Sequence, residues 1–220
     1  MIDFVVNGSW GTRPQTVQQL GVKWAETFAA LHGMGEDALS GWREDAGPRS
    51  RSAEFAAFTP EALTEYIERE NRDADDPYIG YVASLEKMQS RTMVRTSILV
   101  GGQSVWVTNS VVLSFSSRVV DEDSVPAVRR AHEILRIFAD VWDLDLGQVY
   151  RHSQDDVVDQ ELGLENTDPR CGLAVYLSAN RAALAPEGLP GIYTRTAHGG
   201  LIIDLTHGGT QDPGIETILD

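Results

Sequence analysis

Cysteine is nearly absent from this chain of 220 residues, which contains one, Cys171. A single cysteine excludes an intramolecular disulfide, and no basic amino-terminal segment with a following apolar run precedes Asp3-Phe4. Long apolar runs are lacking too, because those around residues 98–100 and 111–113 are far shorter than the roughly 20 residues of a membrane-spanning helix. We therefore expect a soluble cytoplasmic protein without membrane contact.

Basic side chains are scarce: 18 Lys and Arg stand against 33 Asp and Glu, which gives a formal net charge of −15. This balance argues against direct binding to nucleic acid, since phosphate contacts need Lys and Arg. It favours a basic partner instead. An acidic surface that serves solubility alone would explain the same composition.

Two segments concentrate the acidic side chains. Residues 155–168 contain six carboxylates and no Lys or Arg, whereas in residues 68–76 the acids are partly offset by Arg69 and Arg72. We expect the first segment to form a partner interface, with the second as the next choice. The candidate partner-binding residues are Asp155, Asp156, Asp159, Glu161, Glu165, Asp73, Asp75 and Asp76. The nearby aromatics Tyr78, Tyr81 and Tyr150 are candidate anchors, although ordinary core or edge packing is the preferred interpretation of each.

Signatures of catalysis are also lacking: the chain has no Gly-x-Ser-x-Gly elbow, no phosphate-binding loop and no dinucleotide fingerprint. His198 and His207 flank one predicted strand, on the order of 30 Å apart if it is extended, so they cannot share a metal. We read both as turn residues and His152 as a loop residue without further zinc ligands. The sequence thus predicts no catalytic residue, no metal, no cofactor and no enzyme activity.

The remaining reactive side chains have ordinary structural explanations. Cys171 opens an apolar strand pattern and is predicted to be a buried thiol, and His132 is predicted to lie on the polar side of a helix. Trp24 and Trp142 fall on apolar stripes and are predicted to be in the core. Trp106 alternates with its valine neighbours in a predicted strand, so both a core position and a surface anchor stay open.

Apolar side chains at steps of three and four residues predict three helices. The first follows Arg13-Pro14, with its stripe at Val17, Leu20, Trp24, Phe28 and Leu31. The second starts at Thr59-Pro60-Glu61, a capping residue, a proline and an acid, and ends near Arg72. The third follows residues 121–124 and has such a broad apolar face that it should be central: Val128, Ala131, Leu135, Phe138 and Trp142.

Strands are predicted at residues 4–6, 149–150, 173–177, 192–194 and 201–205. Between Arg91 and Phe115, Val, Thr, Ile and Trp interrupted by Gly101-Gly102 predict two strands joined by a tight turn. Helices and strands come in mixed order, and no repeat or linker divides the chain. We therefore expect an α+β fold in one domain over residues 1–220, with a mostly antiparallel sheet packed against a few amphipathic helices.

The opening, Trp10-Gly-Thr-Arg13 before a helix with Gly41-Trp42 after it, resembles the immunity protein 52 family of bacterial polymorphic-toxin systems. The segments Cys171-Gly-Leu-Ala-Val-Tyr176-Leu-Ser and His198-Gly-Gly-Leu-Ile-Ile-Asp204-Leu look like the family's closing strands, so the resemblance covers most of the chain. Trp10 and Trp42 match its signature positions and are read as fold-defining, with a structural role for Arg13.

The resemblance implies a protein that binds and neutralises a toxin domain encoded nearby. The toxin is expected to be a nuclease with a basic surface, which the charge of −15 would complement. Two other classes stay open: an acidic nucleic-acid mimic or regulatory module with a host target, and a hydrolase that uses Asp or Glu. The sequence does not predict an oligomeric state.

Overall fold

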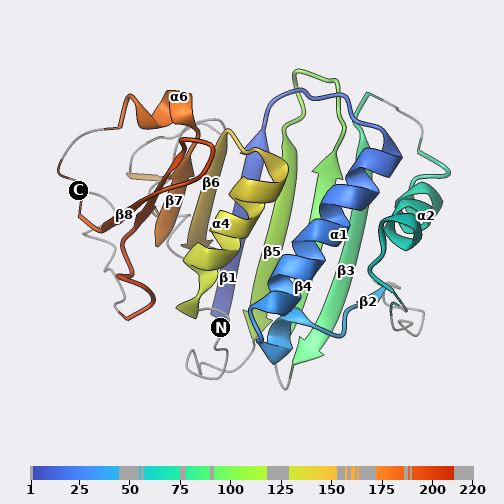
Figure 1. The fold of residues 1–220 in the computed structure, drawn as a ribbon, viewed down its shortest axis with the longest axis horizontal. Coiled ribbons are helices and arrows are strands. Elements are labelled where there is room, and N and C mark those ends of the chain that lie inside the picture. The colour runs from blue at the N-terminus through green and yellow to red at the C-terminus, as the bar shows by residue number, and fades with distance from the viewer. Residues whose placement is uncertain are drawn as a thin grey trace.

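An antiparallel sheet of nine strands carries the fold (Figure 1). The computed structural model describes residues 2–44, 55, 57–74, 78–89, 92–117, 129–152, 157, 160–161, 163, 172–185, 188 and 190–210. Within this part of the chain the strand order is β2-β3-β4-β5-β1-β6-β7-β9-β8. The strands are β1 Ile2–Trp10, β2 Arg43–Glu44, β3 Tyr81–Gln89, β4 Thr92–Val100, β5 Asn109–Ser117, β6 Leu146–Arg151, β7 Ala174–Leu177, β8 Ile192–Arg195 and β9 Leu201–Asp204.

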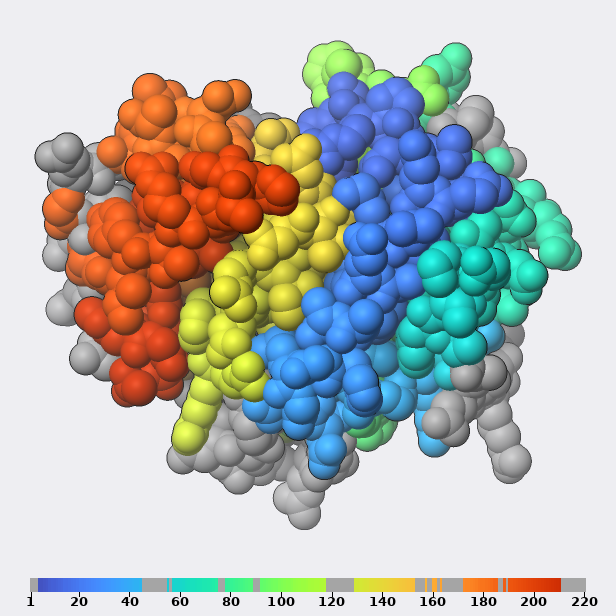
Figure 2. Space-filling model, viewed as in Figure 1, coloured from blue at the N-terminus to red at the C-terminus, as the bar shows by residue number. Residues whose placement is uncertain are grey.

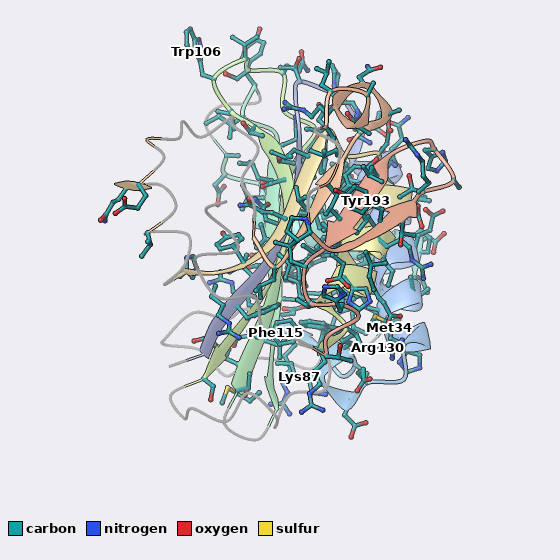
Figure 3. The ribbon with its side chains drawn as sticks, turned by 90° about the vertical axis from the view of Figure 1, so that its left-hand side faces the viewer. Met34, Lys87, Trp106, Phe115, Arg130 and Tyr193 are labelled. Carbon is teal, nitrogen blue, oxygen red and sulfur yellow. The ribbon has the colours of Figure 1, made fainter. Side chains whose placement is uncertain are left out.

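The long helices cover one face of this sheet, as the side view in Figure 3 shows. They are α1 Val17–Gly33, α2 Pro60–Glu70 and α4 Ala131–Trp142; the short helices are η1 Asp37–Leu39 and α6 Ala179–Ala182. Figure 2 shows α1 and α4 packed side by side on that face. The predicted α+β class, with an antiparallel sheet against a few amphipathic helices in a single domain, is confirmed.

The main core lies between the three long helices and the sheet. Strands β4 and β5 bury alternate residues, so one face of each, such as Val111, Leu113 and Phe115, points to the helices. The described residues of the predicted stripes are buried against this face, and Trp24 and Trp142 are fully buried, as expected. Val128 of the third predicted stripe lies outside the described residues. A smaller apolar cluster of Val175, Leu177, Ala182, Leu201 and Ile203 lies around β7, β9 and α6.

Local sequence fixes where α1 and α2 begin. The backbone N–H of Gln19 donates to Thr16 Oγ1 at 3.3 Å, and the N–H of Thr16 donates back to Gln19 Oε1 at 2.9 Å. This reciprocal capping box satisfies two amide groups at the start of α1. Thr59 accepts from the N–H of Ala62 at 3.3 Å, and α2 then runs from Pro60 to Glu70, close to its predicted bounds.

The tight turn predicted at Gly101-Gly102 is wrong, because residues 101–108 form a longer connection, which we call the β4–β5 loop. The glycines instead allow close approach of neighbouring backbone: a Cβ on Gly102 would lie 2.6 Å from the carbonyl oxygen of Ile79. Strand β3 was not predicted. Only Tyr81, Ala83 and Leu85 alternate inward in it, and Lys87 interrupts the apolar pattern.

Candidate functional site

Most of the predicted partner-binding residues lie outside the residues that the structure describes: Asp155, Asp156, Asp159, Glu165, Asp75 and Asp76, as does Cys171. Asp73 and Glu161 are described and exposed. The interface predicted on the two acidic segments therefore stays a prediction. Of the candidate aromatic anchors, Tyr78 is exposed, whereas Tyr81 and Tyr150 are half-buried.

Several exposed large apolar side chains of the described residues lie at one end of the sheet, on and beside the β4–β5 loop. Trp106 is 91% exposed and Val105 is 80% exposed. Figure 3 shows Trp106 projecting away from the rest of the molecule. Tyr78 and Ile79 are exposed as well, and they contact the same loop, since the N–H groups of Gln103 and Ser104 donate to the carbonyl of Tyr78 at 2.9 and 3.1 Å.

Hydrogen bonds hold this loop in place. The N–H of Gly102 donates to Oδ1 of the buried Asn109 at 2.9 Å, and Nδ2 of Asn109 donates to the carbonyl of Gly11 at 2.7 Å. The N–H of Trp106 donates to Ser104 Oγ at 3.2 Å. The exposed tryptophan therefore stands on a backbone that is already ordered, which lowers the entropy lost on binding.

A pocket of about 360 Å³ lies under the same loop. Its walls come from the end of β1, the base of the loop, the start of β6 and α6: residues 9–12, Ser104, Val105, Val107, Thr108, Asp145, Leu146 and Arg181. β1 lies beside β5 and β6 in the sheet, which brings these segments together from distant parts of the sequence. Val105 and Val107, the residues on either side of Trp106, line this pocket.

Asp145 is fixed in the pocket wall by its own backbone and side chain. Its N–H donates to the carbonyl of Ser9 at 2.9 Å, and its Oδ2 accepts from the N–H of Gly11 at 3.1 Å. Arg181 lines the same pocket. Within the described part of the chain, neither Asp145 nor Arg181 takes part in an ion pair.

Two cations hold the carboxyl end of α4 next to this pocket. Arg13 donates to the carbonyls of Trp142 at 2.8 Å and Asp143 at 2.9 Å, and Lys23 donates to that of Val141. Positive charge at a helix carboxyl end is favourable because of the helix dipole. Burial, followed by the charge of Arg13, lowers the pKa of Lys23.

Trp10 is part of the same structure. The rings of Trp10 and Trp142 stack with centroids 5.5 Å apart, and the Arg13 guanidinium lies 5.6 Å from the Trp10 ring. Arg13 also pairs with the Asp143 carboxylate at 3.4 Å. The structural roles predicted for Trp10 and Arg13 are confirmed, and Trp42 is likewise buried.

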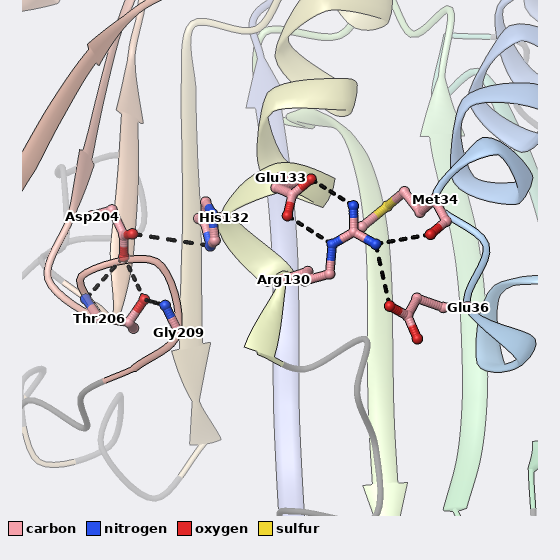
Figure 4. A network of polar contacts seen from close by, with 8 residues as sticks. All are labelled: Met34, Glu36, Arg130, His132, Glu133, Asp204, Thr206 and Gly209. Atoms are coloured by element: carbon pink, nitrogen blue, oxygen red, sulfur yellow. Dashed lines mark hydrogen bonds and ion pairs between the residues drawn. The ribbon is translucent and has the colours of Figure 1, made fainter.

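The amino end of α4 is held by Arg130 (Figure 4). Its guanidinium donates to both carboxylate oxygens of Glu133, at 2.7 and 2.8 Å, and to the carbonyl of Met34 at 2.8 Å and Glu36 Oε1 at 3.2 Å. These bonds connect α4 to the end of α1. The hydrogen bond from Arg130 is the main reason that the pKa of Glu133 is lowered.

His132, predicted on the polar side of its helix, is half-buried, and its Nδ1 lies 3.9 Å from Oδ2 of the buried Asp204 (Figure 4). Asp204 also accepts from the N–H groups of Thr206 at 2.8 Å and Gly208 at 2.7 Å. His198 and His207 lie in turns, as predicted.

Two further findings concern the described residues alone. No helix among them is both long and apolar enough to cross a membrane. They also contain no group of three or more His, Cys, Asp or Glu side chains placed to hold a metal ion.

Sequence reasoning missed the pocket residues Asp145 and Arg181. Neither stands in a recognisable motif, and they meet only through the order of strands in the sheet. Trp106 carried a usable signal, since it lies between Gly101-Gly102 and Asn109, residue types that are typical of turns.

No protein-family model and no curated protein matches this sequence. Among solved structures, the chain is similar to the Pseudomonas aeruginosa T6SS protein PA0821, with 12% sequence identity and a TM-score of 0.48. The alignment covers 99% of this chain and 73% of that one. This is a weak likeness in the course of the backbone at low identity, so it gives no information about activity or partner.

Proposed function

We propose that this chain is an immunity protein that binds and neutralises a cognate toxin domain. The observation that carries the proposal is Trp106, which is 91% exposed on a loop fixed by hydrogen bonds. An indole in water does not stabilise the free chain, whereas tryptophan is among the residues that contribute most to protein interfaces. The β4–β5 end of the sheet therefore supports a role in binding a protein.

The charge of −15 supports a basic partner, such as the nuclease domain that the family resemblance implies. Exposed ion pairs contribute only about 0–1 kcal/mol each, so acidic residues alone would not hold a toxin. Complementary charge chiefly raises the rate of encounter, and buried apolar anchors then slow dissociation. In this proposal the chain performs no catalytic step and acts by occluding the active site or substrate cleft of the toxin.

The experiment is co-expression of this chain with the carboxy-terminal domain of the large protein encoded directly upstream. We expect growth to be restored and the two proteins to purify together. Toxicity without rescue, together with the absence of a complex, would contradict the proposal. An activity screen for a carboxylate-dependent hydrolase and a search for a host target would then follow.

A further inference from the structure

We propose that the pocket under the β4–β5 loop receives an arginine or lysine side chain of the partner protein, with Asp145 as its acceptor. That the bound side chain belongs to a toxin rests on the proposed function. Whether the pocket binds a cation can be tested without the toxin.

Shape is the first reason. Val105 and Val107 line the pocket, and the residue between them, Trp106, projects outward from the same loop. A partner that contacts Trp106 would therefore also lie close to the residues that line the pocket. The volume of about 360 Å³ is near the lower end of the range for ligand sites, roughly 300–1,000 Å³, so it suits a long side chain.

The acceptors are the second reason. Oδ2 of Asp145 accepts from the N–H of Gly11 at 3.1 Å, which orients the carboxylate, and no contact within the described part of the chain engages Oδ1. Ser9, Ser104 and Thr108 also line the pocket. A guanidinium or ammonium group offers several N–H donors and no acceptor, so it matches a pocket wall that contains a carboxylate and residues with hydroxyl groups.

Asp145 and Arg181, which carry opposite charges, both line the pocket, so the lining alone does not say whether a cation or an anion binds there. The net charge of the chain decides. The chain as a whole carries −15, which repels an anionic partner and attracts a cationic one. In a cation site, Arg181 opposes binding. Removing the charge of Arg181 should therefore strengthen binding, and removing that of Asp145 should weaken it.

The test is a titration of the ¹⁵N-labelled full-length chain with N-acetyl-arginine amide, followed by NMR. We expect saturable shifts of the amide signals of Gly11, Ser104 and Asp145. N-acetyl-citrulline amide, which has the same shape without the charge, is the matched control and should cause no saturable shift at these positions.

Three variants test whether the pocket prefers a positively charged ligand. Asp145→Asn keeps an oxygen for the Gly11 N–H and should weaken binding of N-acetyl-arginine amide roughly tenfold. Arg181→Gln should strengthen it. Glu65→Gln removes an exposed charge on α2, away from the pocket, and should change nothing.

Several results would overturn the inference: no saturable shift at the pocket, equal shifts with the citrulline compound, or unchanged binding in Asp145→Asn. Binding of N-acetyl-glutamate amide that is lost in Arg181→Gln would show an anion site instead. If the NMR titration shows no cation binding but co-expression rescues growth and the two proteins purify together, the cation pocket is contradicted and the immunity function is not. If the titration shows cation binding but no toxin complex forms, the immunity function is contradicted and the cation pocket is not.

Discussion

Arg13 connects the end of α4 to β1 through one guanidinium. It donates to two carbonyls at the end of α4, pairs with Asp143 and lies beside the ring of Trp10. The planar, forked shape of arginine allows these contacts together, whereas lysine has a single point charge. A lysine at position 13 therefore could not make all of these contacts.

Arg13→Ala should lower the free energy of unfolding by about 1–3 kcal/mol, because it removes two charge-assisted hydrogen bonds and leaves carbonyls at the helix end without their donor. Arg13→Lys should recover only part of the loss. Urea unfolding of both variants measures the effect, with the exposed Arg72→Ala as control. Equal stability of wild type and Arg13→Ala would contradict this account of the α4 terminus.

Trp106→Ala should leave stability within about 0.5 kcal/mol of wild type, since the side chain is 91% exposed. The same change should weaken the complex with the toxin domain about thirtyfold, the scale of a binding hot spot. Thermal unfolding and calorimetric titration measure the two effects. Met88→Ala, on another exposed side chain, is the control and should bind normally. Normal affinity of the Trp106 variant would place the interface elsewhere.

At the scale of elements, the contact between α1 and α4 depends on pH through Glu133. Because its folded pKa lies below the ordinary value of 4.5, the ionised group stabilises the fold above that pH. This stabilisation is lost as the pH falls from about 4.5 through the lowered pKa. Because the pKa of Glu133 is lowered in the folded state, protonation of this carboxylate favours the unfolded chain.

Arg130→Met should therefore cost most stability near neutral pH and progressively less below about pH 4.5. Denaturation at a series of pH values measures this difference between wild type and variant. Glu133→Gln, which cannot titrate, should show the same convergence with wild type in acid. A difference that stays constant over the whole pH range would mean that the pair makes no pH-dependent contribution.

The helices were predictable because each has one face against the core. The stripe of α1 and the inward residues of α4, among them Phe138 and Trp142, follow directly from helical periodicity. The start of the β4–β5 loop at Gly101-Gly102 was predicted, but its length was not, since the contacts of Gly102 with Ile79 and Asn109 involve residues outside a tight turn.

The candidate site was predictable only in part. Exposure of Trp106 was one of two open alternatives, and the fold decided between them. Asp145 and Arg181 come together with Ser9 because β1 lies beside β6 and α6 follows β7. A single sequence contains no local signal for such neighbours.

At the scale of the whole molecule, the acidic charge should act on the rate of association. Replacing Asp155, Asp156 and Asp159 by Lys changes the net charge from −15 to −9, as three negative groups become positive. We expect slower association with the toxin and a weaker dependence on salt. Stopped-flow kinetics at several salt concentrations measure both.

The matched control reverses Glu26, Glu65 and Glu68, exposed residues on α1 and α2, and so gives the same net charge. A larger effect from residues 155–159 would locate the interface near them. Equal effects of the two sets would mean that only the total charge matters, and unchanged kinetics in both would exclude electrostatic steering.

The position of β1 has a consequence for how the protein is made. Strand β1 pairs with β5 and β6, which both follow it in the chain, and its register with β6 reaches Arg151. At roughly 5–20 residues per second, the nascent chain spends on the order of ten seconds before β6 exists to complete that pairing. The centre of the sheet thus closes late in synthesis, and a growing chain has no complete pocket to offer a partner until Arg181 on α6 has been added.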